Sequence, residues 1–347
     1  MRFKNILNLA FVFCISISAL AGNSHHEHNG EVDIKSQIKE TISHHLKDSY
    51  DFTITHGVSF PLPVILIDGG LHVFMSSKFH HGETVAESNG NYYKIFHSKI
   101  YKVDGPEGEI ILDDHHHATN DKPLDFSITK NVFVIMLMCV FMFFVFKGAA
   151  KGYQNSQLPQ KSARFLEPII LYIRDDIAIP NIGKKHYKRY MSYLLTIFFF
   201  IWFINLAGLT PLGINITGNI AVTLSLALLT YFITTFTGNK NYWGHIFWMP
   251  GVPTPMKIVL APIELLGTII KPFSLMIRLY ANMTAGHVVL MSIIGLMFVF
   301  KSWIGSPLSF GLAFALSLLE LLVAALQAYI FTMLSALYFG AAVEEHH

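Results

Sequence analysis

The sequence has few charged residues and almost no cysteine. Of its 347 residues, only 14% are Asp, Glu, Lys or Arg, whereas a soluble domain averages about 25%. Too few charges are available to coat a water-exposed surface of this size, and the composition excludes a disordered chain, a coiled coil and a nucleic-acid-binding protein. Cys14 and Cys139 both lie in apolar runs, which excludes a disulfide framework and a CxxC metal site.

Apolar side chains are abundant instead. They make up 52% of the chain, with 29 Phe, and the mean hydropathy is +0.44. This composition favours a polytopic membrane protein.

The charge divides the chain in two. Residues 22–127 contain 8 Lys against 16 Asp or Glu, together with 13 of the 18 histidines. Residues 128–347 contain 15 Lys or Arg against 7 Asp or Glu. The pattern predicts an acidic, His-rich extension at 22–127 joined to an apolar membrane domain at 128–347.

The first 21 residues have the features of a signal peptide. Arg2 and Lys4 precede an apolar stretch from Ile6 to Leu20, and Ala19-Leu20-Ala21 fits the small-x-small cleavage rule. The apolar stretch is short for a span, so a removable signal peptide is favoured over an uncleaved anchor. Export would place residues 22–127 in the periplasm.

The extension shows weak strand patterns at Val58–Ile67 and Tyr92–Val103, separated by Gly, Asn and Pro turns. Its histidine tracts, at 25–28 and 115–117, permit a metal site, but fixed ligand spacing in an ordered frame is missing. Solvated tracts are the favoured interpretation, and we expect no metal site.

After Asp125 the sequence becomes strongly apolar. A bilayer core requires about 20 apolar residues per helix, and five segments meet this length: 128–147, 190–210, 219–237, 258–300 and 307–342. The loop between the first two segments is rich in Lys and Arg, and by the positive-inside rule it is cytoplasmic. The sequence therefore predicts an all-α polytopic membrane protein, with its N-terminus outside and its C-terminus inside.

The last two segments are too long for ordinary spans, so these helices must tilt, break or run along the interface. Gly267 and Pro272 offer places for a break. The stretch 165–180 predicts a helix on the cytoplasmic surface, and 241–255 has too many prolines to span.

Ionisable side chains within spans are costly and are functional candidates by default. Glu264, Lys271 and Arg278 are seven residues apart and share one helical stripe, with Asn282 near it and His287 on the opposite side. Small or polar residues around Arg278 predict close contact with another helix: Ser274, Ala281, Thr284, Ala285 and Gly286.

Glu320 and Gln327 share a face of the last helix. A structural alternative is that Arg278 pairs with a carboxylate to hold helices together, and that His287 and Glu320 form a satisfied interhelical hydrogen bond. Arginine is effectively never deprotonated, so Arg278 cannot relay protons, but it can ionise a nearby carboxylate or block cations.

The stretches SLMIRLYANMTAGH (274–287), LQAYIFTMLSALY (326–338), WGHIFWMPGVPTPMKIVLAPIELLG (243–267) and VTLSLAL (222–228) closely resemble subunit a of the F-type ATP synthase. The resemblance covers 190–347 well and 128–189 loosely, and 22–127 matches only as an enlarged extension. It implies the ion-channel stator of the Fo sector, whose two long tilted helices wrap a rotating ring of c subunits.

The resemblance also implies residue roles. Arg278 matches the arginine that faces the ring, ionises each passing ring carboxylate and keeps ions from leaking between two offset half-channels. Asn282 and Gln327 match polar positions beside it, and Glu264 matches a carboxylate of the cytoplasmic half-channel. Asn219 stands where the family often has an acidic residue, so its part in the channel is doubtful.

His287 and Glu320 depart from the best-known bacterial form, in which the glutamate and the histidine occupy the exchanged positions. The exchange suggests that the two side chains face each other and work as a relay pair in the outer half-channel. Ion identity depends mostly on the ring carboxylate, so sodium stays an alternative to protons.

The expected function is therefore proton translocation past the c ring, without covalent chemistry and without a cofactor. The expected partners are the c ring, subunit b of the peripheral stalk, the F1 sector and the lipid bilayer, and no nucleic acid. A secondary cation transporter using Arg278, Glu264 and Glu320 is the alternative, although we find no inverted repeat. A membrane metalloenzyme fits less well, because no HExxH motif occurs.

Overall fold

The computed structural model describes residues 48–55, 58–82, 84–114, 117–155, 162–210, 214–249, 251, 253–299 and 305–344. The chain forms two compact units. The first extends to Val134 and includes Gly208–Ile214, and the second consists of Ile135–Ala207 and Asn215–His347. The predicted signal peptide, the tract at 25–28, and His115 and His116 lie outside the described residues.

The first unit is built from short antiparallel strands: β1 (Asp51–Thr55), β2 (Val58–Pro61), β3 (Pro63–Ile67), β4 (Leu71–Met75), β5 (Ala86–Ser88), β6 (Asn91–Phe96), β7 (Lys99–Val103) and β8 (Leu124–Asp125). They form three sheets, in the orders β1-β2, β4-β3-β8 and β5-β6-β7, and a 3₁₀ helix, η1 (Ser76–Gly82), follows β4. Strands therefore lie at both places where the alternating pattern predicted them.

Alternation of apolar residues gives this unit a small core. Val64, Leu66, Phe79, Tyr93 and Ile100 are almost fully buried. The inward-facing residues of β3 and β4 supply one side of the core, because successive side chains of a strand point to opposite faces.

The second unit is helical: α3 (Lys130–Asn155), α4 (Ser162–Tyr172), the π-helical turn η2 (Ile173–Ala178), α5 (Ile179–Ile182), α6 (Tyr187–Gly208), α7 (Ile220–Thr237), α8 (Lys240–Phe247), α9 (Thr254–Val299) and α10 (Gly305–Val343). Within the described residues, five of these helices are long and apolar enough to cross a membrane, namely α3, α6, α7, α9 and α10. The five predicted spans are confirmed. The stretch 165–180 is helical, as predicted, and it contains the π-helical turn.

The helix α6 supplies much of the core. Leu194 and Phe199 are fully buried, and the ring of Tyr190 stacks on Phe339 of α10 at 4.6 Å between centroids. At Gly340 the backbone of α10 comes so close to α5 that an added Cβ would lie 1.9 Å from the carbonyl oxygen of Asn181. Glycine at this position allows α10 to pack against the segment that precedes α6.

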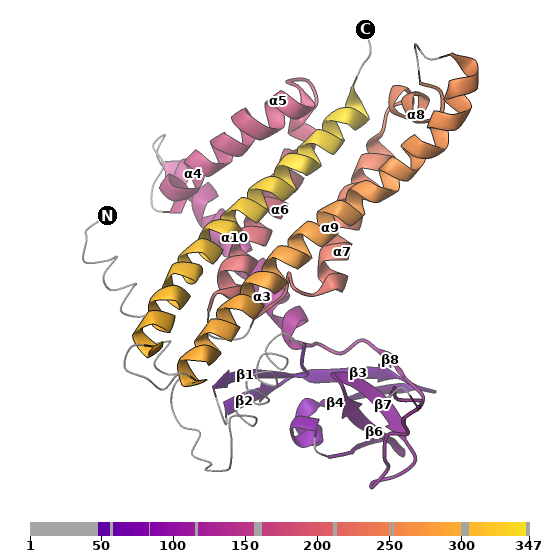
Figure 1. Cartoon of the computed structure of the whole chain (residues 1–347), viewed down its shortest axis with the longest axis vertical. Coiled ribbons are helices and arrows are strands. Elements are labelled where there is room, and N and C mark those ends of the chain that lie inside the picture. The colour runs from indigo at the N-terminus through magenta and orange to yellow at the C-terminus, as the bar shows by residue number, and fades with distance from the viewer. Residues whose placement is uncertain are drawn as a thin grey trace. The chain divides into compact units, whose positions relative to one another are not determined.

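The last two helices are continuous and lie side by side (Figure 1). The helix α9 has 46 residues, which at 1.5 Å per residue makes it about 69 Å long, and α10 has 39 residues. The helix α9 passes through Pro262 and Pro272 without a break, although the sequence offered Gly267 and Pro272 as places for one. Both helices exceed the hydrocarbon thickness of about 30 Å, so each must tilt in a bilayer.

Candidate functional site

One stripe of α9 is buried against the other helices. Its residues follow one another at intervals of three or four, as one face of an α-helix requires: Thr268, Pro272, Leu275, Leu279, Met283 and His287. Leu275 and Leu279 join the same apolar core as Ala328 and Phe331 of α10. This stripe fixes the rotation of α9 about its axis and so determines which residues face away from the bundle.

Arg278 lies at the edge of this stripe, on the side that turns outward. Its side chain is partly exposed, whereas Ser274, Ala281, Asn282 and Ala285 are exposed. No described residue of the chain covers this face of Ser274, Ala281, Asn282 and Ala285.

Two cations of α9 approach one tyrosine of α10. The Nζ atom of Lys271 lies 5.6 Å from the ring centroid of Tyr338, and Arg278 is close enough to Tyr338 to interact with it electrostatically. The sequence prediction placed Lys271 and Arg278 on one stripe but missed Tyr338. Tyrosine is common in apolar helices and carries no charge, so the sequence offered no signal for it.

Glu320 of α10 packs against the backbone of α9 at the residue that precedes His287. His287 is 6% exposed, and Glu320 Oε1 lies 2.5 Å from the place that a Cβ on the preceding residue, Gly286, would occupy. The carboxylate of α10 thus rests on α9 immediately beside His287. Glu320 Oε2 is buried and has no hydrogen-bond partner among the described residues.

The other predicted site residues are dispersed. Gln327 is buried, with 2% exposure, and Glu264 is partly buried. Glu264 precedes Arg278 by 14 positions on α9, or about 21 Å along the helix axis, so the two do not meet. Asn219 caps α7, and its side-chain oxygen accepts a hydrogen bond from Ala221 N at 2.9 Å.

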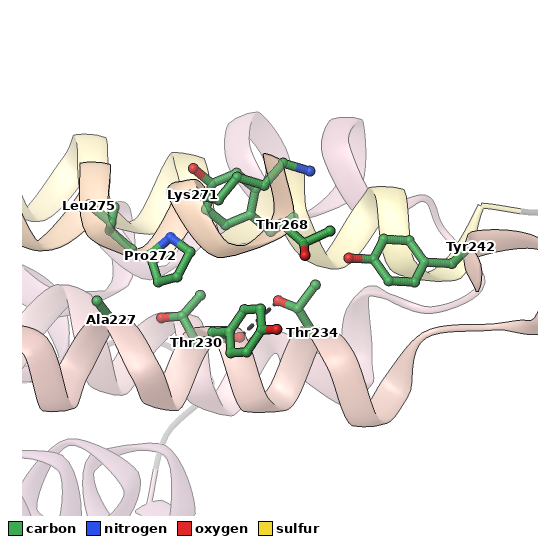
Figure 2. Close-up of a pocket in the computed structure, with 10 residues that line it drawn as sticks. Ala227, Thr230, Thr234, Tyr242, Thr268, Lys271, Pro272 and Leu275 are labelled. Atoms are coloured by element: carbon green, nitrogen blue, oxygen red, sulfur yellow. Dashed lines mark hydrogen bonds between the residues drawn. The ribbon is translucent and has the colours of Figure 1, made fainter. Parts of the chain in front are cut away.

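A narrow pocket, whose lining includes threonine and tyrosine side chains, lies farther along the same helices, among α7, α8, α9 and α10. Figure 2 shows Thr230 and Thr234 of α7 opposite Thr268 and Lys271 of α9, with Tyr242 of α8 at one end. Its volume is about 10 Å³, roughly the space that one water molecule needs. Burial raises the pKa of Tyr242 above its usual range, so its phenol stays neutral.

A buried polar pair lies where α6 ends and α7 begins. Thr217 Oγ1 donates a hydrogen bond of 2.8 Å to Asn205 Oδ1, and both residues are almost completely buried. Asn205 Nδ2 is buried without a partner in the part of the chain that the structure describes. The sequence did contain a signal for Asn205, because a polar amide inside a span is unusual. The sequence prediction considered ionisable side chains and therefore did not include it.

The described residues contain no group of three His, Cys, Asp or Glu side chains that could hold a metal ion. Of the tract at 115–117, only His117 is described, and its Nδ1 atom lies 3.7 Å from Asp113 Oδ2.

Comparisons with known proteins decide between the functions that this arrangement permits. A family model described as "ATP synthase A chain" matches residues 132–340, which include α6, α7, α8, α9 and all the ionisable candidates. The chain belongs to this family. A second model, described only as a domain of unknown function, matches residues 41–126.

Named relatives agree with the family. The chain is 36% identical over 319 residues to "ATP synthase subunit a" of Chloroherpeton thalassium, covering 84% of this chain and 91% of that protein. It is 44% identical over 227 residues to "ATP synthase subunit a 2" of Chlorobaculum tepidum, covering 63% and 64%. It is 40% identical over 231 residues to "ATP synthase subunit a" of Myxococcus xanthus, covering 65% and 76%.

Family membership assigns the chain to the membrane sector of ATP synthase, where it takes part in proton translocation as a component of the complex. It is a multi-pass membrane protein. The secondary cation transporter considered from the sequence is not favoured.

Proposed function

We propose that the outward face of α9 around Arg278 contacts the ring of c subunits. The observation that carries this proposal is the face itself: small residues surround a partly exposed cation, and no described residue covers them. Small residues let a second helix approach closely. A cation held at such a contact lowers the pKa of a passing ring carboxyl group, so that the carboxyl releases its proton there and takes up another before it re-enters lipid.

The outer half-channel, in this proposal, includes His287 and Glu320. They come from facing helices, and the Glu320 carboxylate lies against the residue beside His287. Imidazole and carboxyl groups both exchange protons, and imidazole does so near neutral pH when unperturbed. In this proposal, Gln327 and Asn282 orient the contacts of Arg278, and Glu264 serves the cytoplasmic half-channel, about four helical turns away along α9.

The chain acts as a non-catalytic stator in this proposal, with its extension in the periplasm and its C-terminus in the cytoplasm. The basic loop between α3 and α6 supports the orientation. The peripheral stalk, including subunit b, would hold the chain still while the c ring turns, and nucleotide chemistry would belong to F1. Labelling of Glu344→Cys from each side of sealed vesicles tests the orientation, and reagent access to this cysteine from the extension's side would contradict it.

The decisive experiment replaces Arg278 by alanine. We expect ATP synthesis to be lost while passive proton uptake by vesicles stripped of F1 is retained or increased, because the electrostatic barrier between the half-channels is gone. Arg189→Ala is the matched control, since Arg189 is an exposed cation at the start of α6 and should be dispensable. Normal synthesis in Arg278→Ala would make Arg278 a structural residue and refute the proposal.

The relay pair has a separate test. His287→Ala should abolish proton-driven synthesis, and the single exchanges His287→Glu and Glu320→His should each lower it, because each removes one of the two proton-exchanging groups from the pair. The double exchange restores one imidazole and one carboxyl and should recover part of the activity. Intact synthesis in His287→Ala, or no recovery in the double variant, would remove the pair from the pathway.

A further inference from the structure

The extension exposes an apolar sheet face in the part of the chain that the structure describes. The face belongs to the sheet β4-β3-β8, and its most exposed members are Leu71 at 63%, Val73 at 58%, Leu124 at 65% and Phe126 at 63%. Monomeric soluble proteins rarely expose contiguous apolar patches of more than a few hundred square ångströms, and larger ones mark contact sites.

The strand register shows that these residues form one continuous surface. Ile67 pairs with Leu71 on one side and with Leu124 on the other, and Phe126 N donates to Ile65 O at 2.9 Å. The whole set points the same way because side chains alternate along a strand. It contains no polar side chain: Pro63, Ile65, Ile67, Leu71, Val73, Met75, Leu124, Phe126 and Ile128.

The opposite face of the same sheet packs into the hydrophobic core of the extension. Val64 and Leu66 of β3 and Phe74 of β4 are buried there, together with His72. The register is therefore fixed by packing on one side, and the apolar residues on the other side are not the result of a slipped strand.

The apolar face leads directly to a membrane helix. Ile128 N donates to Pro63 O at 3.1 Å, so pairing with β3 continues to two residues before Lys130, where α3 begins. Two extended residues span about 7 Å. The polar region on each side of the hydrocarbon core is about 5–7 Å thick. With the candidate span beginning at Lys130, the edge of the sheet would lie at the depth of the lipid headgroups.

The hairpin β1-β2 contacts the first turn of the same helix. The ring of Phe133, in the first turn of α3, lies 5.6 Å from Phe52 and 6.5 Å from Phe60, measured between centroids. Phe60 is 54% exposed. This cluster of phenylalanine rings ties the hairpin to the first turn of α3.

We propose that this apolar face rests on the lipid surface at which α3 enters the bilayer. The extension would then be an interfacial domain that holds the first membrane helix at a fixed depth, rather than a domain projecting into water. Burial of the face between lipid headgroups would remove it from water, which is favourable in proportion to the apolar area.

Nitroxide labels on the complete chain test this placement. Cys14 and Cys139 are replaced by serine, and single labels are attached through Val73→Cys, with Leu71→Cys as a second reporter. Both side chains are exposed, so the labels should be tolerated. The protein is reconstituted in palmitoyl-oleoyl-phosphatidylcholine vesicles, and label relaxation by oxygen, which concentrates in lipid, is compared with relaxation by a water-soluble nickel chelate.

Two further labels calibrate the result. Lys99→Cys on β7 lies on another sheet and is exposed, so it should report water. Met136→Cys on α3 is 54% exposed and should report hydrocarbon. We expect an oxygen-to-nickel ratio at Val73 and Leu71 several-fold above that of Lys99, and below that of Met136. Adding Leu124→Asp should reduce the ratio at Val73, since a charge on this face opposes contact with lipid.

Two results would overturn the proposal. A ratio at Val73 equal to that of Lys99 would show that the face is in water. A label shielded from both reagents would show that protein covers the face, whether the upstream part of this chain, a second copy or another subunit. Neither result bears on Arg278, so this inference and the proposed function fail independently.

Discussion

Glu320 of α10 lies directly against Gly286 of α9. A Cβ added to Gly286 would be 2.5 Å from Glu320 Oε1 and 3.3 Å from Glu320 Cδ, both closer than a comfortable contact. The absence of a side chain at Gly286 therefore makes the room in which the carboxylate lies. The position of the Glu320 carboxylate therefore depends on Gly286, a residue that has no side chain and no functional group.

The first prediction follows from this contact. Gly286→Ala should displace the Glu320 carboxylate without unfolding the protein, because the atom that must move is the end of a flexible side chain. If Glu320 relays protons, ATP synthesis driven by a proton gradient should fall by about tenfold, since misplacement by about 1 Å can cost up to about 100-fold where geometry matters. Synthesis is measured in vesicles containing the assembled complex.

Gly267→Ala is the control for this variant. Gly267 lies on the same helix, and an added Cβ would meet nothing within 4 Å, so synthesis should stay at the wild-type level. Equal synthesis in both variants would show that the exact position of Glu320 is immaterial and would weaken its assignment to the outer half-channel.

The sequence was informative where a strong physical requirement left a repeating pattern. The five spans follow from apolar length, and the placement of Arg278 and His287 on different sides of one helix follows from the helical period. The sequence did not predict that α9 continues through Pro272 without a break. Pro272 is buried near residues of α7 and α10. Proline is tolerated in membrane helices where neighbouring helices satisfy the freed backbone groups, and such neighbours are far away in the sequence.

Other features of the site left no pattern at all. Tyr338, Thr230 and Thr234 are uncharged and cost little inside an apolar helix, so the search for expensive residues did not find them. Gly286 and Gly340 look like any other small residues in a span. Their importance arises only when α10 packs against its neighbours, which a single sequence does not specify.

The second prediction concerns the packing of α10 against α5. In Gly340→Ala the new Cβ would lie 1.9 Å from the carbonyl oxygen of Asn181. A backbone atom cannot move aside as a side-chain end can, so the helices must separate. We expect destabilisation of about 1–3 kcal/mol, typical of overpacking, seen as a lower thermal unfolding temperature of the purified protein in detergent.

Gly311→Ala tests whether this loss is specific. Gly311 is on the same helix, and an added Cβ would have nothing within 4 Å. It should leave the unfolding temperature unchanged or slightly higher, because alanine is the better helix former. A similar fall in both variants would attribute the effect to the helix itself and not to its contact with Asn181.

The third prediction concerns the extension. Tyr50 is 6% exposed, and its hydroxyl donates a hydrogen bond to Asp125 Oδ2. Burial, and then the hydrogen bond and the charge of Asp125, raise the pKa of Tyr50 far above its usual range. The absorbance of ionised tyrosine, measured as wild type minus Tyr50→Phe during alkaline titration, should therefore appear at higher pH than for ordinary tyrosines.

The same rise in the pKa of Tyr50 determines how the stability of the extension changes with pH. Because the folded pKa is above the unfolded one, the bond's contribution is complete below about pH 10, the ordinary pKa of tyrosine, and shrinks as the pH rises further. Below that pH, Tyr50→Phe should lower the free energy of unfolding of the extension by about 1–2 kcal/mol, measured as faster proteolysis. A difference absorbance at the ordinary pH of tyrosine would refute the buried bond.

The last prediction separates capping from proton transfer at Asn219. The resemblance to subunit a raised the question of a channel role, because the family often has an acidic residue here. In the structure Asn219 accepts a hydrogen bond from Ala221 N and begins α7. If capping is its function, Asn219→Ala should cost about 1 kcal/mol of stability, while Asn219→Asp keeps the cap and adds a favourable charge at the helix N-terminus.

Both variants should sustain ATP synthesis at temperatures where they are folded. A large loss of synthesis in stable Asn219→Ala, rescued by Asn219→Asp, would instead place this residue in the proton pathway.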